Sequence, residues 1–235
     1  MKILDRTFFS PAHDLACDEA LLEESESSGG AELLRFWQPK KYFAVLGYSN
    51  AWKEEVRASS RVPVYRRCSG GGTVLQGPGC LNYSLILRIE PGGPLEDIRS
   101  TNAFILKRHR EAMEGVLKKK VSVQGHTDLT LDTLKFSGNS QRRKRDRLLF
   151  HGTFLLDFKL PEMDRCLRLP AKQPAYRQNR THSEFLTNLH VPAQKVKQSL
   201  AEAWGAKIKL ADVPYKRIEE LTLERYSKDA WNLRF

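Results

Sequence analysis

The sequence predicts an α+β fold in which mixed β-sheets are flanked by helices. Short strand-like segments come first along the chain, and they do not alternate regularly with helices. One of them, residues 81–89 (LNYSLILRI), has apolar side chains at every second position, which is the period of a half-buried strand. From about residue 190 onward the pattern is helical, with apolar residues at positions 196, 200, 203 and 204. Strands followed by a helical end favour an α+β fold over a series of βαβ units.

The amino-terminal third of the chain begins with a predicted helix. Ser10 is a suitable N-cap, Pro11 fits the first turn, and the helix is expected to end near Gly29. The segments expected next are a strand in 32–37, a strand in 42–48, a helix over 52–59 and a strand in 62–67. The last of these strands leads directly into three glycines.

The central and carboxy-terminal parts contain longer elements. The segments expected there are a helix over 95–117 and strands around 121–123, 129–131, 134–141 and 148–158. In the last strand, alternation puts Leu148, Phe150 and Phe154 on one face and His151 on the other. The final amphipathic helix is expected to end at Gly205.

The charge balance indicates an acidic partner. Lysines and arginines number 39 against 28 acidic residues, a formal net charge of +11. Such an excess favours association with nucleic acid, an anionic membrane, a phosphorylated ligand or an acidic protein. Part of it lies in dense clusters at 118–120 and 142–145, which could equally be solvated surface. No paired zinc ligands and no aromatic RNA-binding strand accompany these clusters, so no nucleic-acid module is indicated.

Cysteine usage and hydropathy indicate the compartment. The four cysteines, at positions 17, 68, 80 and 166, show neither CxxC pairing nor histidines at metal spacing, so we expect reduced thiols and no zinc site. No apolar run approaches the ~20 residues of a membrane span, and the first residues lack the apolar segment of a signal peptide. We therefore expect a cytoplasmic protein without a membrane partner.

Residues 66–74 (RRCSGGGTV) place two arginines beside three consecutive glycines. A Walker-type loop is excluded because no Gly-Lys pair exists, and a dinucleotide fingerprint starting at Gly70 would need glycine where Leu75 stands. Glycines lack a Cβ, so backbone N–H groups can lie against an anion, and Arg66 and Arg67 supply further donors. A glycine bulge between two strands is the alternative, and the pattern alone leaves both readings open.

A second polar segment, residues 134–142 (LKFSGNSQR), strengthens the anion-site interpretation. Strand alternation predicts Lys135 and Ser137 on the face opposite their apolar neighbours, and Gly138 again allows close backbone approach. A lone lysine would normally be a solvated surface group. A lysine set between core residues, and followed on the next strand by HGT at 151–153, is a better candidate for holding an acyl carbonyl and a phosphate.

These motifs together resemble the lipoate-protein ligase family, which is related to biotin-protein ligases and to octanoyl and lipoyl transferases. The matching motifs are RRxSGGGxV at 66–74, the DL and K(I/F)SG(N/S)(A/S)QR elements at 128–129 and 135–142, and the HGTLLL-like strand at 151–156. Further similarity covers DLACDEALLE at 14–23, LRFWQP at 34–39, VLGYSN at 45–50 and ERYSKDAWN at 224–232. The resemblance thus spans almost the whole chain in the correct order.

The resemblance implies the catalytic fold of biotin and lipoate ligases, which is similar to that of class II synthetases. It also implies a two-step reaction with ATP and Mg²⁺ as cofactors and lipoate as substrate. ATP and lipoate form lipoyl-adenylate, and a lysine of a lipoyl-carrier domain then attacks the mixed anhydride. The expected partner is an acidic carrier domain, either of a 2-oxoacid dehydrogenase E2 subunit or of a glycine-cleavage H-type protein, which would explain the +11 charge as well as nucleic acid would.

The resemblance assigns roles to residues by position. Lys135 is the expected catalytic residue, which contacts the carboxylate or acyl carbonyl and the α-phosphate. Asp128 is expected both to bind the adenylate and to be the candidate magnesium ligand. The expected lipoyl-adenylate-binding set is Arg67, Ser69, Gly70, Gly71, Gly72, Gln76, Asn82, Asp128, Ser140, Arg142, His151 and Thr153.

The chain departs from the family pattern at four positions. Gln76 and Gly77 replace the usual His-Asp pair, Cys80 stands where asparagine is common, and Thr127 replaces an asparagine. The choice among lipoate, octanoate and another acyl acid therefore stays open.

We expect residues 1–235 to form a single biotin/lipoate-ligase-type catalytic domain without the carboxy-terminal accessory domain that many such ligases carry. Activation then occurs in this chain or requires a separate accessory subunit. The main alternative is an octanoyl or lipoyl transferase of the same fold, which carries the acyl group on a cysteine thiolate. No cysteine lies shortly before Lys135, and Cys166 lacks the expected glycine context, so the ligase is favoured.

Overall fold

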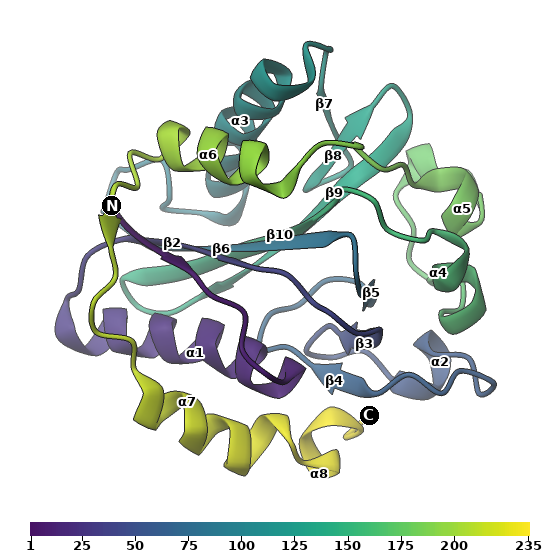
Figure 1. Ribbon diagram of the computed structural model, residues 1–235, viewed down its shortest axis with the longest axis horizontal. Coiled ribbons are helices and arrows are strands. Elements are labelled where there is room, and N and C mark those ends of the chain that lie inside the picture. The colour runs from purple at the N-terminus through teal and green to yellow at the C-terminus, as the bar shows by residue number, and fades with distance from the viewer.

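The computed structural model describes all 235 residues and contains two β-sheets (Figure 1). Eight strands form a large mixed sheet in the order β11-β1-β2-β6-β10-β9-β8-β7, and three short strands form a second sheet in the order β4-β3-β5. The large sheet consists of β1 (Lys2–Asp5), β2 (Leu33–Trp37), β6 (Cys80–Arg88), β7 (Ser122–Gln124), β8 (Asp128–Leu131), β9 (Leu134–Arg143), β10 (Arg147–Leu155) and β11 (Ile208–Lys209). The small sheet consists of β3 (Phe43–Leu46), β4 (Val64–Arg66) and β5 (Val74–Gln76).

Helices cover both faces of the large sheet. Figure 1 shows α1 and α7 below it and α3 and α6 above it, while α4 and α5 lie together at the right-hand side, with α5 in contact with β9. The helices are α1 (Pro11–Ser28), α2 (Trp52–Glu55), α3 (Ile98–Leu117), α4 (Pro161–Cys166), α5 (His182–Phe185), α6 (Ala193–Ala203), α7 (Tyr215–Leu221) and α8 (Asp229–Asn232), with a 3-10 turn at Ala175–Arg177 and a π-helical turn at Thr222–Tyr226. None of the helices is long and apolar enough to cross a membrane.

The hydrophobic core is divided by the sheet itself. Alternation along β6 and β10 sends Leu85 and Phe150 toward α3 and α6, and it sends Ile86 and Leu149 toward α1. All four side chains are at most 1% exposed, and burial of each stabilises the fold by about 1.5–3 kcal/mol. A third cluster joins the small sheet to α4. The predicted α+β architecture and the period-2 pattern of both strands are confirmed. The expectation that residues 81–89 are only half-buried was wrong, because helices cover both faces of the sheet at β6.

The predicted ends of the helices are confirmed at α1 and α6. Ser10 caps α1 by accepting a hydrogen bond from the His13 amide, and Gly29 ends it with φ 66°. Gly205, with φ 59°, follows α6. The predicted helix over 52–59 was too long: it stops at Glu55 because Val56 turns extended and forms a β-bridge with Leu167.

A β-bulge in β9 changes which residues share a face with Lys135. The pairing with β8 runs from Leu129 opposite Ser137 to Thr130 opposite Lys135, so Phe136 is an extra residue. Lys135 therefore lies on the same side as Gly138, where an added Cβ would come within 2.7 Å of the lysine Nζ. The prediction that Lys135 shares a face with Ser137 was wrong, because the extra residue of the bulge shifts the alternation of side chains by one position.

The chain changes sheets directly after the glycine motif. The motif connects β4 to β5 in the small sheet, and residues 77–79 then carry the chain across to β6 in the large sheet. Both β4 and β5 pair with β3 and not with each other, so the glycines form a connecting loop and not a bulge within a strand pair. The crossing leaves a space between the two sheets beneath the glycine loop.

Candidate active site

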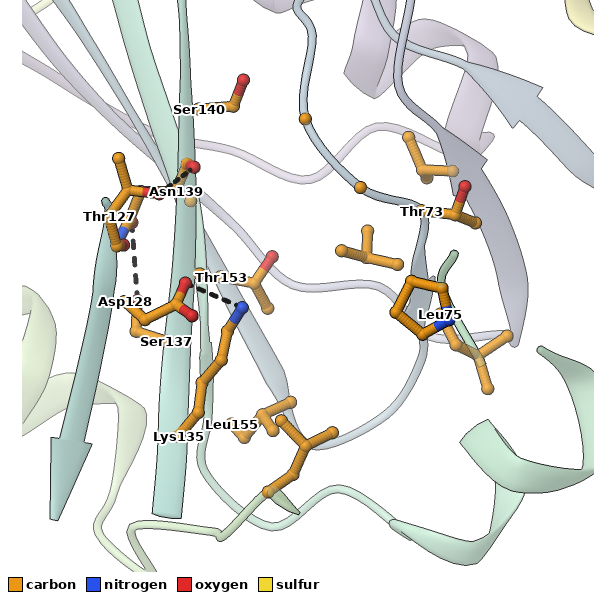
Figure 2. Close-up of a pocket in the computed structure, with 18 of the residues that line it drawn as sticks. Thr73, Leu75, Thr127, Asp128, Lys135, Ser137, Asn139, Ser140, Thr153 and Leu155 are labelled. Atoms are coloured by element: carbon orange, nitrogen blue, oxygen red, sulfur yellow. Dashed lines mark hydrogen bonds and ion pairs between the residues drawn. The ribbon is translucent and has the colours of Figure 1, made fainter. Parts of the chain in front are cut away.

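A pocket of about 690 Å³ opens between the two sheets and continues under the segment that carries α4 and α5. Figure 2 shows Lys135 and Asp128 on one wall and Thr73 and Leu75 on the opposite wall. The predicted site residues that line the pocket are Arg67, Gly71, Gly72, Gln76, Asn82, Asp128, Lys135, Ser140, His151 and Thr153. The sequence motifs, far apart in the chain, thus meet in one cavity.

Lys135 and Asp128 form an ion pair at the open part of the pocket. The lysine Nζ lies 2.8 Å from Asp128 Oδ1, and the two side chains are 26% and 11% exposed. The Tyr176 hydroxyl donates to Asp128 Oδ2 at 2.7 Å, so both carboxylate oxygens are held. The ammonium retains access to the cavity and is available for a ligand oxygen. Tyr176 was not predicted, because residues 173–182 read only as a polar loop.

The glycine loop is organised around Arg67, which is 8% exposed. Its Nε donates to Ser69 Oγ at 3.0 Å, and its Nη2 donates to the carbonyls of Gly70 and Gly72. Burial lowers the pKa of Arg67 to about 10, so the guanidinium is still charged at neutral pH. Arg67 therefore fixes the shape of the loop and brings a positive charge to the pocket wall.

A close contact between two backbone segments fixes the loop from outside. An added Cβ on Gly47, just after β3, would lie 2.0 Å from the Gly71 carbonyl oxygen. Gly71 itself has φ 87°, a conformation that costs other residues strain. Glycine is therefore required at position 47 by close packing and at position 71 by backbone conformation, whereas an added Cβ at Gly70 or Gly72 would meet nothing within 4 Å.

A buried chain of polar contacts connects the glycine loop to β10, α1 and β2. Ser69 Oγ lies 2.6 Å from His151 Nε2, and His151 Nδ1 lies 3.5 Å from Asp18 Oδ2. Arg35 lies 2.5 Å from both Asp18 and Asp14. Burial opposes the charge of Asp18, but Arg35 and His151 outweigh it and hold the pKa of Asp18 below its usual value. The sequence prediction missed Asp18; its only signal was the DLACDEALLE similarity.

A second polar cluster ties the two sheets together. Gln76 of β5 donates from Nε2 to Asn82 Oδ1 of β6 at 3.0 Å and to Thr153 Oγ1 of β10 at 2.8 Å. Asn82 Nδ2 returns a bond to Gln76 Oε1 at 2.9 Å, and Thr153 also bonds to Asn82 Oδ1. The cluster uses most of its own hydrogen-bonding capacity, so it forms a wall of the pocket.

Three of the predicted site residues do not line the pocket: Ser69, Gly70 and Arg142. Ser69 is 1% exposed and contacts Arg67 and His151, as described above. Arg142 donates from Nη1 to the Cys68 carbonyl at 2.8 Å, and the Gly70 carbonyl accepts from Ser140 Oγ at 2.9 Å. These residues hold the loop in place, and their direct contact with a ligand stays a prediction.

No thiol lines the pocket. All four cysteines are buried, and none of them is among the lining residues. Burial raises the pKa of Cys17, Cys68 and Cys80 to about 12, so these three are neutral thiols at physiological pH. The prediction that the cysteines are free and structural agrees with this arrangement.

The residues do not form a resident metal site. No group of three or more His, Cys, Asp or Glu side chains is placed to hold an ion. Asp128, the predicted magnesium ligand, already has both oxygens engaged by Lys135 and Tyr176. A magnesium ion here would need ligands that arrive with a substrate.

Comparison with known proteins identifies the family. The lipoyl protein ligase A/B catalytic domain model matches residues 10–205. The chain belongs to this family. It is 26% identical to lipoate–protein ligase 1 of Staphylococcus aureus, over 98% of this chain and 72% of the ligase. It is 31% identical to octanoyltransferase LipM of Carboxydothermus hydrogenoformans, over 71% of this chain and 69% of the transferase. The family thus includes enzymes of both predicted types.

Solved structures confirm the predicted lipoate-ligase fold. A lipoate-protein ligase A bound with ATP superposes with a TM-score of 0.84, over 99% of this chain and 98% of that one. A bi-partite lipoate protein ligase of Thermoplasma acidophilum, studied with its E2 lipoyl domain, gives 0.82 over 99% and 95%. Both are 20% identical to this chain, and at that level the likeness shows the fold.

Proposed function

We propose that the protein is an ATP-dependent lipoate-protein ligase, which activates lipoate to lipoyl-adenylate and transfers the lipoyl group to a lysine of a lipoyl-carrier domain. The observation that carries the proposal is a pocket that offers the Lys135 ammonium and no thiol. Such a site can align two substrates and neutralise negative charge, but it cannot carry an acyl group on sulfur. Adenylation needs alignment of the substrates and neutralisation of their negative charge, whereas the cysteine-dependent transferase reaction needs a thiol that carries the acyl group.

In the first step the lipoate carboxylate oxygen attacks the α-phosphorus of ATP, and the bond from that phosphorus to pyrophosphate breaks. Both reactants are anions, so they repel each other as they approach. Lys135 is proposed to contact both groups, and Arg67 to add positive charge from the glycine loop, since both residues line the pocket. The polar cluster of Gln76, Asn82 and Thr153 also lines the pocket.

In the second step the neutral amine of the target lysine attacks the carbonyl carbon, and AMP leaves with the electrons of the broken C–O bond. Negative charge grows on the carbonyl oxygen during attack and on the phosphate as it leaves. In the first step Lys135 already contacts the carboxylate and the α-phosphate. It can therefore stabilise both charges in the second step without moving far. The amine proton passes to solvent through the open mouth of the pocket.

ATP and lipoate are proposed as the substrates, with magnesium entering as the ATP complex. Solved relatives of the same fold include one bound with ATP, which supports nucleotide binding in such a pocket. The remaining lining residues of the predicted adenylate-binding set are proposed to contact the adenylate. The choice of lipoate over octanoate is part of the proposal.

The carrier is proposed to be an acidic lipoyl domain of an E2 subunit or a glycine-cleavage H-type protein. The archaeal relative was studied with its E2 lipoyl domain, and a net charge of +11 favours an acidic partner. The same relative is bi-partite, so a separate accessory subunit is the variant of this proposal to test. The cytoplasmic location stays a prediction.

The second candidate function is octanoyl or lipoyl transfer without ATP. The 31% identity to an octanoyltransferase favours it, whereas the absence of a pocket thiol opposes it. An octanoyl donor that already carries an activated thioester would make adenylation unnecessary. The two functions differ in their need for ATP and in their need for a cysteine.

The test is ATP–pyrophosphate exchange by the isolated chain with lipoate, octanoate and biotin in parallel, followed by transfer to a lipoyl domain. We expect exchange with lipoate, and subsequent modification of one carrier lysine, detected as a mass increase. Transfer from synthetic lipoyl-adenylate without exchange would indicate a missing accessory subunit. Transfer from octanoyl-carrier protein that disappears in Cys166→Ala would overturn the proposal in favour of the transferase.

A further inference from the structure

Arg177, in the 3-10 turn between α4 and α5, is a buried cation without a carboxylate. It lines the same pocket and is 5% exposed. The only hydrogen bond of its guanidinium runs from Nε to the Arg180 carbonyl at 3.0 Å, and the buried Nη2 has no partner. The guanidinium packs over the Phe185 ring, with its central carbon 4.7 Å from the ring centroid. A charged group is thus held firmly in place with its donors unused.

Such an arrangement destabilises the folded protein unless something else compensates it. A guanidinium has five N–H donors, and a buried one with an unpaired end loses its solvation without a protein partner in return. Burial lowers the pKa of Arg177, and the more distant carboxylates of Asp164 and Asp128 only partly offset this effect. Asp164 is the first carboxylate in its field, but His182 and Ser183 already occupy that carboxylate. No carboxylate of the chain forms an ion pair with Arg177, and its buried Nη2 is free to bind an anion from outside the chain.

Arg177 is connected to Lys135 through its neighbour in sequence. Tyr176 precedes Arg177 and donates a hydrogen bond to Asp128, the carboxylate paired with Lys135. Arg168 and Lys172, from the same stretch of chain, also line the pocket, and no ion pair engages either of them. Three cations without ion pairs within residues 168–177 provide more positive charge than a single carboxylate needs, and they suit a ligand with several negative charges.

We propose that Arg177, with Arg168 and Lys172, binds the β- and γ-phosphates of ATP and so holds the pyrophosphate leaving group. The inference rests on the proposed ATP-dependent function. Lys135 serves the α-phosphate and the carboxylate, while the Arg177 end takes the charge that departs when the bond to the α-phosphorus breaks. Arg177 would then act in adenylation only, because pyrophosphate has left before the acyl group is transferred.

The experiment separates the two half-reactions in the full chain. Arg177→Gln should raise the KM for ATP in pyrophosphate exchange by about 10- to 100-fold, the loss expected for charge-assisted hydrogen bonds. Its binding of inorganic pyrophosphate, measured by calorimetry, should weaken by a similar factor. Transfer from synthetic lipoyl-adenylate to a lipoyl domain should keep its wild-type rate, because that reaction contains no pyrophosphate.

Two further variants guard against a folding effect. Lys172→Gln changes an exposed side chain of the same pocket end and should raise the KM for ATP by about 3- to 10-fold without affecting stability. Arg165→Gln changes a surface arginine whose side chain is 73% exposed and that does not line the pocket, so it should alter neither constant.

The outcomes distinguish this inference from the function on which it rests. If wild-type exchange is active and Arg177→Gln leaves both the KM for ATP and pyrophosphate binding unchanged, the inference is overturned and the ligase function stands. If wild type shows no exchange but binds pyrophosphate in a way that Arg177→Gln abolishes, the phosphate site stands and the activation step fails. A wild-type chain that neither exchanges nor binds pyrophosphate overturns both.

Discussion

Arg35 and Arg177 are both buried, at 0% and 5% exposure, but their surroundings differ. Arg35 contacts two carboxylates, Asp14 and Asp18, both also buried. Arg177 contacts one backbone carbonyl and one aromatic ring. The first cation forms ion pairs within the chain, whereas the second forms none and has only more distant carboxylates around it. Burial alone therefore does not separate a structural charge from a functional one; the partners do.

The same contrast runs along the whole pocket. At the end near α1, Asp18 and His151 contact one another and their neighbours, and Gln76 bonds to Asn82 and Thr153. Arg35 Nε is also without a partner, but Arg35 does not line the pocket. At the end near α5, Gln173 Oε1 and Arg177 Nη2 belong to lining residues and have no partner. We infer that the first end is a preformed wall and that the second end is completed by a ligand. Four predictions test this division.

The largest effect is expected for Arg35→Met, which leaves two buried carboxylates without a cation. We expect the free energy of unfolding to fall by about 3–5 kcal/mol in urea denaturation. Arg217→Met is the matched control, since Arg217 pairs with Glu23 at 2.8 Å on the surface and should cost less than about 1 kcal/mol. Equal losses in the two variants would mean that the end near α1 is not a charge-paired wall.

Lys135→Ala should reduce activity and leave stability intact. Removal of one preorganised cation from a developing negative charge lowers the rate by about 10²- to 10³-fold, measured here as lipoate-dependent pyrophosphate exchange. The unfolding midpoint should not move, because the lysine is partly exposed. Lys159→Ala, at an exposed lysine that pairs with Glu162, is the control for both measurements. A marked drop in thermal stability would identify Lys135 as a structural residue instead.

Gln76→Leu should have an intermediate effect, since it leaves Asn82 and Thr153 with unsatisfied buried groups. We expect a loss of about 1–3 kcal/mol in the free energy of unfolding. Gln198→Leu removes a similar amide bond, to Glu202 at 3.0 Å on the surface of α6, and should be nearly neutral. If Gln76→Leu is as stable as wild type, the cluster does not tie the two sheets together.

The smallest effect is expected from thiol chemistry. Because burial raises the pKa of Cys68 and Cys80 to about 12, about one thiol in 10⁴ is ionised at pH 8, and this fraction grows tenfold per pH unit. Iodoacetamide at pH 8 should therefore leave the native protein unmodified in intact-mass spectra and fully active. The same reagent in denaturant should add four groups. Rapid native alkylation with loss of activity would support the cysteine-dependent alternative.

The sequence predicted elements whose pattern is local. The Ser10 cap, the alternation of β6 and β10 and the stripe of α6 are set by neighbours in the chain, and each is confirmed. The motif resemblance also brought distant segments together correctly, because Lys135, Arg67 and His151 line one pocket. Their chemical roles remain to be measured.

Features that depend on tertiary contacts were not predictable. The extra residue Phe136 has no local signal, since it exists only relative to the register of β8, and it reverses the face assigned by alternation. Asp18 looked like any acidic residue of a helix until Arg35 and His151 were placed beside it. Arg177 lay in a segment that read as an ordinary polar loop, and only its burial and lack of partners set it apart.

The contact between Gly47 and Gly71 has a consequence for how this protein can vary. A side chain at position 47 would occupy the place of the Gly71 carbonyl oxygen, although position 47 lies outside the glycine motif. Libraries that vary the glycine loop and its surroundings to change ligand choice should therefore keep position 47 as glycine. Substitutions at Gly47 should in turn be selected against as strongly as those at Gly71, although only Gly71 belongs to the motif.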